Sequence, residues 1–247
     1  MVVGGGGGKI VAVTAWGEVL RGLAEATAGA PLLMYGSRAP RWPDVALPSS
    51  DYDLLVVREG APPQKRVVDL GSEMRIDLTI LARRAVQNGR LMSPQQHVAD
   101  RWGERSGDWT WYDLDRPLSW LGADAALGTL QCEAEVALQS RDDAPWLCGL
   151  GVRALRRGLT LLYALGVLGD AAPTWALIEE RYGLPDALVH ALRVERALAG
   201  DPRVGGWAAI VATALQDSLC EVGRAVAAYP KNSSDAVVEQ RLAGAHA

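Results

Sequence analysis

Phenylalanine is absent from the 247 residues, and cysteine and histidine occur only three times each. The missing phenylalanine indicates a GC-rich coding bias and says nothing about function. The cysteines are Cys132, Cys148 and Cys220, and they include no CxxC pair. The sequence therefore predicts neither a disulfide framework nor a zinc site, and we expect a reducing, cytoplasmic environment. The isolated histidines His97, His190 and His246 have no metal-ligand spacing.

Long apolar runs and an excess of basic charge are also missing. No stretch of about 18 uninterrupted apolar residues occurs, so we expect no membrane-spanning helix. The glycine run that ends at Lys9 has neither the charge and apolar pattern of a signal peptide nor the ending of a phosphate loop, and we interpret it as a flexible tail. The net charge of −4 indicates no strong nucleic-acid binding and favours a cationic acceptor over a polyanion.

The predicted elements are mixed α/β first and all-helical afterwards. Apolar runs predict strands at residues 31–35, 52–57, 66–70 and 74–81. Helical spacing predicts helices at 11–28, 82–88, 94–102, 119–139, 145–168, 174–182, 185–199 and 206–228. The proline-containing residues 38–50 should form a loop, and 109–117 should be irregular. We therefore predict an α+β protein with a small mixed-sheet domain at 10–110, a helical bundle domain at 111–229, and flexible tails at 1–9 and 230–247.

The strongest chemical signal lies in two of the predicted strands. Asp51 and Asp53 are two positions apart, so their carboxylates should point to the same face. Adjacent carboxylates repel each other unless a cation lies nearby, and Mg²⁺ prefers carboxylate oxygens together with substrate phosphates. Asp77 lies between apolar neighbours on a later strand and would join them if the strands are adjacent. Three carboxylates can hold two metal ions for an in-line displacement. The alternatives are a solvated strand edge for the first two and surface alternation for Asp77.

Gly36 and Ser37 follow the first apolar run and predict a tight turn. Such a turn can aim backbone N–H groups and the Ser37 hydroxyl at phosphate oxygens. Arg38 and Arg41 lie close behind and can neutralise phosphate charge. A Gly-Ser pair also fits an ordinary turn, so this interpretation depends on the aspartates.

In this order the segments resemble the DNA polymerase β-type nucleotidyltransferase superfamily. Its pattern is an apolar strand ending in Gly-Ser or Gly-Gly, a loop, Asp-x-Asp or Asp-x-Glu within an apolar strand, and a later third carboxylate. The corresponding segments here are residues 32–37, 50–57 and 75–79. Many members have a short helix after the turn, whereas Pro40 and Pro43 limit the length of any helix here.

The resemblance implies a role for each matching residue. Asp51 and Asp53 would bind Mg²⁺, with two ions expected. Ser37 and the backbone after Gly36 would hold the β- and γ-phosphates of ATP or another nucleoside triphosphate. Asp77 would be the third ligand or the base that takes the proton of the acceptor.

Two further groups of residues have more than one interpretation. Aromatic residues Trp102, Trp109, Trp111, Tyr112 and Trp120 lie where the two halves should meet. Packing between the domains is the favoured interpretation, and stacking on a nucleobase or acceptor ring is the alternative. Acidic residues Glu133, Glu135, Asp142 and Asp143 lie on or after the first long helix. A solvated face is favoured for them, and recognition of a cationic acceptor or a role as base is the alternative.

Three functional hypotheses follow from the resemblance. The layout resembles aminoglycoside and lincosamide nucleotidyltransferases, in which a helical domain follows the catalytic one, and implies a small-molecule acceptor. Related members would act in natural-product assembly. A toxin–antitoxin-type nucleotidyltransferase that modifies a protein or tRNA is the second hypothesis. A non-catalytic nucleotide-binding module is the third, and the presence of all three carboxylates disfavours it.

Overall fold

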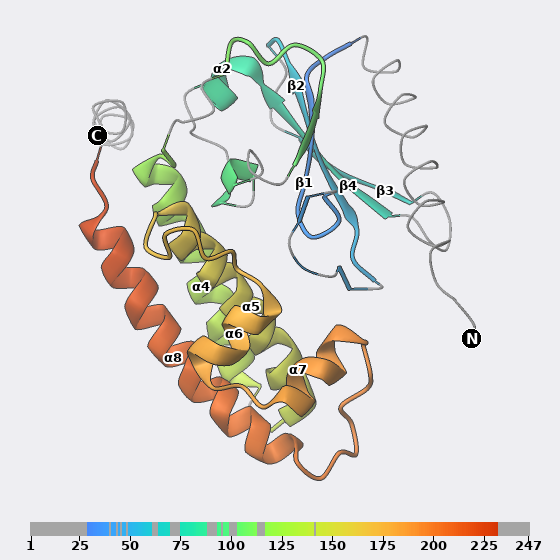
Figure 1. Ribbon diagram of the computed structural model, residues 1–247, viewed down its shortest axis with the longest axis vertical. Coiled ribbons are helices and arrows are strands. Elements are labelled where there is room, and N and C mark those ends of the chain that lie inside the picture. The colour runs from blue at the N-terminus through green and yellow to red at the C-terminus, as the bar shows by residue number, and fades with distance from the viewer. Residues whose placement is uncertain are drawn as a thin grey trace, which may run out of the picture.

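The chain forms a five-stranded sheet followed by a set of helices (Figure 1). This computed structural model describes residues 29–39, 41, 42, 44, 46, 47, 49–60, 64–69, 75–87, 93, 94, 96–98, 103–112, 117–140 and 142–231. The predicted tail at 1–9, the predicted helix at 11–28, Trp102 and most of the predicted tail at 230–247 lie outside the described residues. The α+β class predicted from the sequence is confirmed.

The sheet is mixed, with strand order β3-β4-β2-β1-β5. Its strands are β1 (Leu32–Tyr35), β2 (Tyr52–Arg58), β3 (Gln64–Asp69), β4 (Arg75–Ala82) and β5 (Glu104–Ser106). β2 and β4 are parallel, and the other three pairs are antiparallel. Every residue of β1 is buried, as are residues 54–57 of β2, because both faces of these central strands are covered. Covered strands have continuous apolar sequences, which is why both were predictable.

The two faces of the sheet carry separate apolar clusters. Leu33, Tyr35, Leu55 and Val57 pack on one face together with Leu81 of β4. The other cluster contains Leu32, Met34, Leu54, Val56, Ile76 and Ile80. Side chains alternate between faces along a strand, so Asp53 and Asp77 share the face of Tyr35.

The helices after the sheet build the second core. They are α4 (Trp120–Gln139), α5 (Ala144–Ala164), α6 (Trp175–Tyr182), α7 (Asp186–Arg193) and α8 (Val204–Ala228), while the short α2 (Arg83–Gln87) follows β4. α5 packs against both α4 and α8. Ser119, Asp143 and Thr174 cap the starts of α4, α5 and α6, each accepting a backbone N–H bond. The starts predicted at residues 119, 145 and 174 each lie within one residue of the observed starts.

Two predicted helices end earlier than their apolar patterns indicated, and one strand was missed. α5 ends at Ala164 rather than at residue 168, because Gly166 has a positive φ of 77°. α7 ends at Arg193 rather than at residue 199, two residues before Glu195 with φ 52°. β5 was not predicted because its sequence, Glu-Arg-Ser, has no apolar run. Backbone pairing with β1 alone defines it.

Glycine lets α5 and α8 approach closely, which gives a testable prediction. A Cβ on Gly151 would lie 2.4 Å from Val211 Cγ1, whereas a Cβ on Gly149 would have nothing within 4 Å. We expect Gly151→Ala to lower the free energy of unfolding by about 1–3 kcal/mol through overpacking. Gly149→Ala on the same helix should raise it by up to about 1 kcal/mol, because alanine favours helix. Urea unfolding of both variants measures this, and equal effects at the two positions would contradict the packing described.

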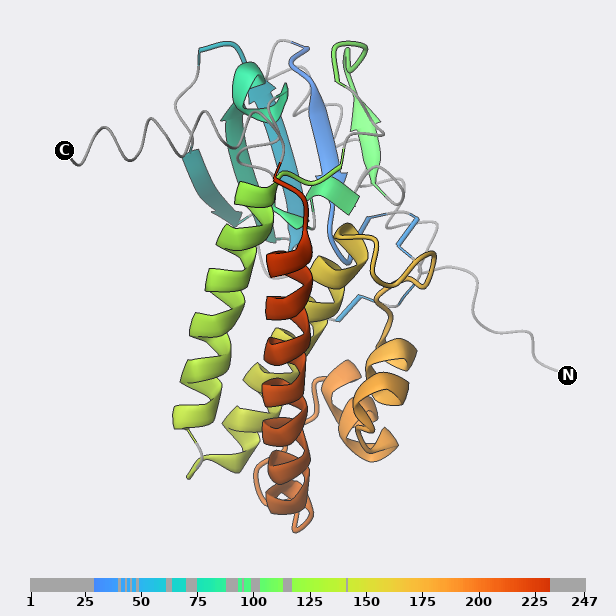
Figure 2. The same ribbon diagram turned by 90° about the vertical axis from the view of Figure 1, so that its left-hand side faces the viewer.

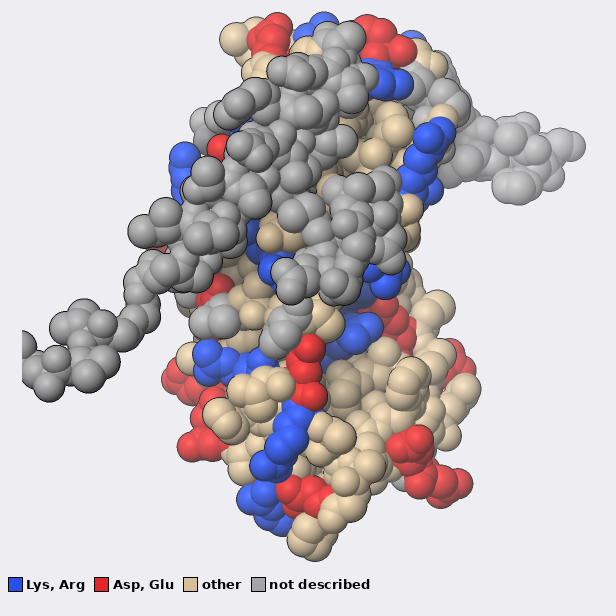
Figure 3. All heavy atoms as spheres, turned by 90° about the vertical axis from the view of Figure 1, so that its right-hand side faces the viewer, with Lys and Arg blue, Asp and Glu red and all other residues tan. Residues whose placement is uncertain are grey.

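The sheet and the helices lie at opposite ends of the molecule, and the carboxyl end of β1 points toward the helices (Figure 2). Within the described part of the chain, no helix combines the length and the apolar character needed to cross a membrane. Basic and acidic side chains are interspersed over the visible described face, so neither sign of charge dominates there (Figure 3).

Candidate active site

The turn at Gly36 touches the predicted metal strand directly. Gly36 has φ 80°, a left-handed conformation that favours glycine. A Cβ at this position would lie 2.1 Å from Asp53 Oδ2, so the Asp53 carboxylate occupies the space that any other residue would need. The backbone continues in turns, with Ala39 N donating to Gly36 O at 3.1 Å. Glycine is therefore required both by the turn and by the neighbouring carboxylate.

The strand register brings two of the three predicted carboxylates side by side. Asp53 pairs with Tyr35 of β1 on one side and with Asp77 of β4 on the other. Asp51 immediately precedes β2. All three aspartates are partly buried. The adjacency of the two strands, on which the predicted role of Asp77 depended, is thus present.

Asp53 is the most perturbed acid of this group. Burial, followed by the negative charges of Asp51 and Asp77, raises the pKa of Asp53 from 3.8 to about 7. Lys65 of β3 and Arg157 of α5 act in the opposite direction. The protein alone therefore does not neutralise this carboxylate, and a proton or a bound cation would do so.

Asp77 has a cationic neighbour that the sequence analysis missed. Lys65 Nζ lies 2.8 Å from Asp77 Oδ2, and the Asp77 side chain is only 17% exposed. The other oxygen, Oδ1, is buried with no hydrogen-bond partner among the described residues. A buried acceptor without a partner is costly, so this atom is suited to a cation or to a donor from a ligand.

These residues fit a hard divalent cation by the chemistry of their donors. They supply carboxylate oxygens only, one of them without a partner, which suits Mg²⁺. Among the described residues, however, no three Asp, Glu, His or Cys side chains converge closely enough to hold a metal ion. The carboxylates would have to turn toward one another on binding. The assignment of Asp51, Asp53 and Asp77 as metal ligands stays a prediction.

The predicted phosphate-binding residues lie in and after the turn. Ser37 is partly exposed beside Gly36, and Arg41 is exposed. Arg38 instead braces the following loop: its Nε donates to Ser50 O, and its guanidinium lies 4.9 Å from the centre of the Tyr52 ring. In this arrangement Arg38 holds the backbone before Asp51, and its contact with phosphate stays a prediction.

The helical part also contributes charge to the site, which sequence reasoning did not foresee. Arg157 of α5 is close enough to Asp53 to lower the pKa of that carboxyl, against the larger effects of burial and of the neighbouring aspartates. Arg157 also forms an ion pair with Glu133 of α4, and Glu133 Oε2 is buried with no hydrogen-bond partner among the described residues. Glu133 is therefore not part of a solvated face. Glu135 and Asp142 are exposed, and Asp143 caps α5.

Tyr35 lies beside Asp53 and extends the polar network. Its hydroxyl accepts a hydrogen bond of 3.0 Å from Gln96 Nε2. Burial, followed by the charge of Asp53, raises the pKa of Tyr35 to about 12. This tyrosine therefore stays neutral near pH 7, where its hydroxyl can donate a hydrogen bond but cannot act as a base.

His97, next to Gln96, gives a prediction about pH. Burial lowers its pKa from 6.5 to about 4. Because the folded state holds the neutral form, stability is lost as the pH falls from about 6.5 toward 4. His97→Gln should lose less stability than the wild type over this range in thermal unfolding at several pH values. The exposed His190→Gln is the control, and an identical pH dependence of wild type and His97→Gln would refute the expectation.

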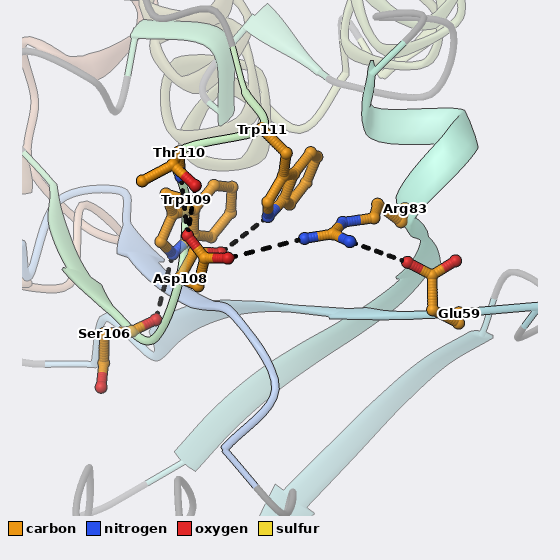
Figure 4. A network of polar contacts seen from close by, with 7 residues as sticks. All are labelled: Glu59, Arg83, Ser106, Asp108, Trp109, Thr110 and Trp111. Carbon is orange, nitrogen blue, oxygen red and sulfur yellow. Dashed lines mark hydrogen bonds and ion pairs between the residues drawn. The ribbon is translucent and has the colours of Figure 1, made fainter.

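The aromatic segment packs against the sheet, at the end opposite the aspartates. Trp109 and Tyr112 belong to the apolar cluster of Leu33 and Leu55. Arg83 lies 4.5 Å from the centre of the Trp111 ring and pairs with Glu59 and Asp108 at 3.2 and 3.9 Å, as Figure 4 shows. These rings therefore have a packing role, but they pack on the sheet and not between the two domains as predicted. Trp120 lies apart on α4, under Lys231 Nζ at 3.8 Å.

Comparisons with known proteins add little to these contacts. No protein-family model matches the sequence, and no curated protein matches it. A solved structure described as a nucleotidyltransferase-like protein from Exiguobacterium sibiricum 255-15 is similar, with 13% sequence identity and a TM-score of 0.31. That similarity covers 86% of this chain and 77% of the other. A similarity of this size says nothing about the function of this chain.

Proposed function

We propose that this protein is a Mg²⁺-dependent nucleotidyltransferase that moves a nucleoside monophosphate, AMP from ATP, onto a hydroxyl or carboxylate of a small-molecule acceptor. The observation that carries the proposal is the register of the sheet. It sets Asp53 beside Asp77 on one face, with Asp51 just before and the Gly36 turn against the Asp53 carboxylate. A structural role alone does not explain adjacent carboxylates in a partly buried place, because their mutual repulsion destabilises the fold.

Each group has a defined part in the proposed reaction. An acceptor oxygen attacks the α-phosphorus, the bond from that phosphorus to the bridging oxygen breaks, and pyrophosphate leaves with the electron pair. Ser37 and the N–H groups of the turn would hold phosphate oxygens. Asp77 Oδ1, which has no partner among the described residues, is the candidate acceptor for the proton or a third metal ligand. Bound Mg²⁺ would supply neutralisation of phosphate charge.

The acceptor is proposed to lie between the sheet and the helices α4 and α5. Two observations support this location. Arg157 joins Glu133 on the helical side to the electrostatic environment of Asp53 on the sheet. Glu133 Oε2, buried and without a partner among the described residues, suits a hydroxyl or ammonium donor of the acceptor. This supports the alternative interpretation of Glu133, that it recognises an acceptor.

The test is release of pyrophosphate from ATP with a panel of acceptors, with Mg²⁺ and without it. We expect release only with Mg²⁺ and a suitable acceptor. Asp142→Asn, which changes an exposed aspartate in the same way as Asp53→Asn, is the matched control and should keep the activity. Transfer that persists in both Asp51→Asn and Asp53→Asn would refute the metal assignment.

Mass spectrometry of the acceptors separates the three hypotheses. A gain of one nucleotide on an aminocyclitol or another small molecule supports the proposal. A gain on a protein or tRNA supports the toxin–antitoxin type instead. Binding of ATP without any transfer supports a non-catalytic module.

A further inference from the structure

The turn at Ser49 and Ser50, directly before Asp51, is held from two sides. From the sheet side, Arg38 donates its Nε to Ser50 O. From the helical side, the carboxylate of Glu195 accepts hydrogen bonds from Ser49 N at 3.0 and 3.1 Å and from the Ser49 hydroxyl. Glu195 is 146 positions away in the sequence. Two charged side chains therefore fix the two peptide units that lead into the metal strand.

Glu195, which accepts these hydrogen bonds from Ser49, has an unusual backbone conformation. Among the described residues, it is the one non-glycine residue with a positive φ, 52°. This conformation is unfavourable for a residue with a Cβ, and such strain persists where surrounding contacts hold it. Its own N–H donates to Leu192 O at 3.1 Å, and the next N–H donates to Ala191 O at 2.9 Å. Glu195 thus lies just after the end of α7, in a turn that these two backbone hydrogen bonds close.

The same loop is attached to the helices at two earlier points. Leu47 packs against the core of the helical part. The Asp44 carboxylate accepts a hydrogen bond from Trp175 N at the start of α6. Ser50 N donates to Leu47 O at 3.0 Å, which closes the turn. The position of Asp51 is therefore set by the helical part as well as by the sheet.

We propose that Glu195 is a positioning residue for the candidate metal site, and that it acts through Ser49 to hold Asp51 beside Asp53. The proposal rests on the proposed function, because it assumes that Asp51 binds a divalent cation. The physical reason is repulsion: without a cation, the charges of Asp51 and Asp53 favour separation, and a turn without a fixed anchor would move to allow it. With the backbone of this turn fixed, only rotation of the side chains is needed to bring the two carboxylates onto the ion.

The experiment measures binding of Mn²⁺ alone to the full chain by electron paramagnetic resonance and calorimetry. Glu195→Gly removes the carboxylate and relieves the positive φ, so the fold should be retained in thermal unfolding. We expect its Mn²⁺ affinity to fall about tenfold, in the range seen when supporting residues of metal sites are changed. Glu195→Gln keeps one acceptor oxygen and should lose less. Glu180→Gln, an exposed glutamate on α6, should bind like the wild type.

Coupling to Ser49 completes the test. Ser49→Ala should weaken Mn²⁺ binding, and the double variant Ser49→Ala with Glu195→Gly should be no weaker than Glu195→Gly alone. If wild type and Glu195→Gly bind Mn²⁺ equally while Asp53→Asn does not bind, the positioning role is overturned and the proposed function stands. If the wild type binds no Mn²⁺, the metal site and the positioning role both fall.

Discussion

Asp53→Asn should abolish nucleotide transfer and, in the absence of divalent cations, make the protein more stable at pH 8. Loss of a metal ligand removes several kcal/mol of transition-state stabilisation, which corresponds to a fall in kcat/KM of about 10³-fold or more. The gain in stability comes from removing a partly buried carboxylate whose charge is opposed by burial and by Asp51 and Asp77. We expect it to be on the order of 2 kcal/mol at pH 8.

The sign of the pH dependence follows from the raised pKa of Asp53. Between pH 3.8 and about 7 the folded state holds a proton on Asp53 that the unfolded state has released. The unfolding free energy of the wild type therefore falls through this range as the pH rises. Asparagine has no such proton, so the advantage of the variant should grow from pH 4 to pH 7 and then stay constant.

Thermal unfolding in EDTA at several pH values, together with pyrophosphate release, measures both effects. Added Mg²⁺ should raise the Tm of the wild type but not that of Asp53→Asn, since binding to the folded state alone stabilises it. Asp142→Asn is the control for loss of one surface charge. A variant that is inactive and also less stable at every pH would indicate that Asp53 has a structural role instead.

Gly36→Ala should reduce activity about 10²-fold and lower the free energy of unfolding. An L-residue in the left-handed region costs about 1–2 kcal/mol. In addition, the new Cβ would lie 2.1 Å from Asp53 Oδ2, so the carboxylate must move. A displacement of about 1 Å at a reacting centre can reduce the rate by about 10²-fold.

Gly60→Ala separates these two causes. Gly60 also has a positive φ, 63°, but a Cβ there would have nothing within 4 Å, and it lies in the turn after β2. Its substitution should cause a similar loss of stability with unchanged kcat/KM. Chemical denaturation and steady-state kinetics of both variants measure the difference. Equal kinetic losses at the two glycines would show that the contact with Asp53 has no special importance.

The local sequence pattern was sufficient to predict an element where consecutive residues have the same kind of surroundings, as in a buried strand. Leu32–Tyr35 and residues 54–57 are continuous apolar runs because both faces of these strands are covered, and the caps of α4, α5 and α6 are short polar residues at helix starts. The sequence could not reveal β5, which has no apolar pattern. The domain limits at residue 110 stay a prediction, although Tyr112 belongs to the core of the sheet and Leu118 to that of the helices.

By itself, the sequence determined the fold class and indicated a glycine turn before the Asp51 strand, because these depend on the apolar pattern and on local backbone geometry. Only the tertiary structure decided that Asp77 pairs with Lys65, that Arg157 pairs with Glu133 and acts on Asp53, and that Glu195 holds Ser49. These contacts join segments far apart in the chain, and no local pattern encodes which charged side chains meet. The predicted metal strand is therefore part of a site whose surroundings the helices largely determine.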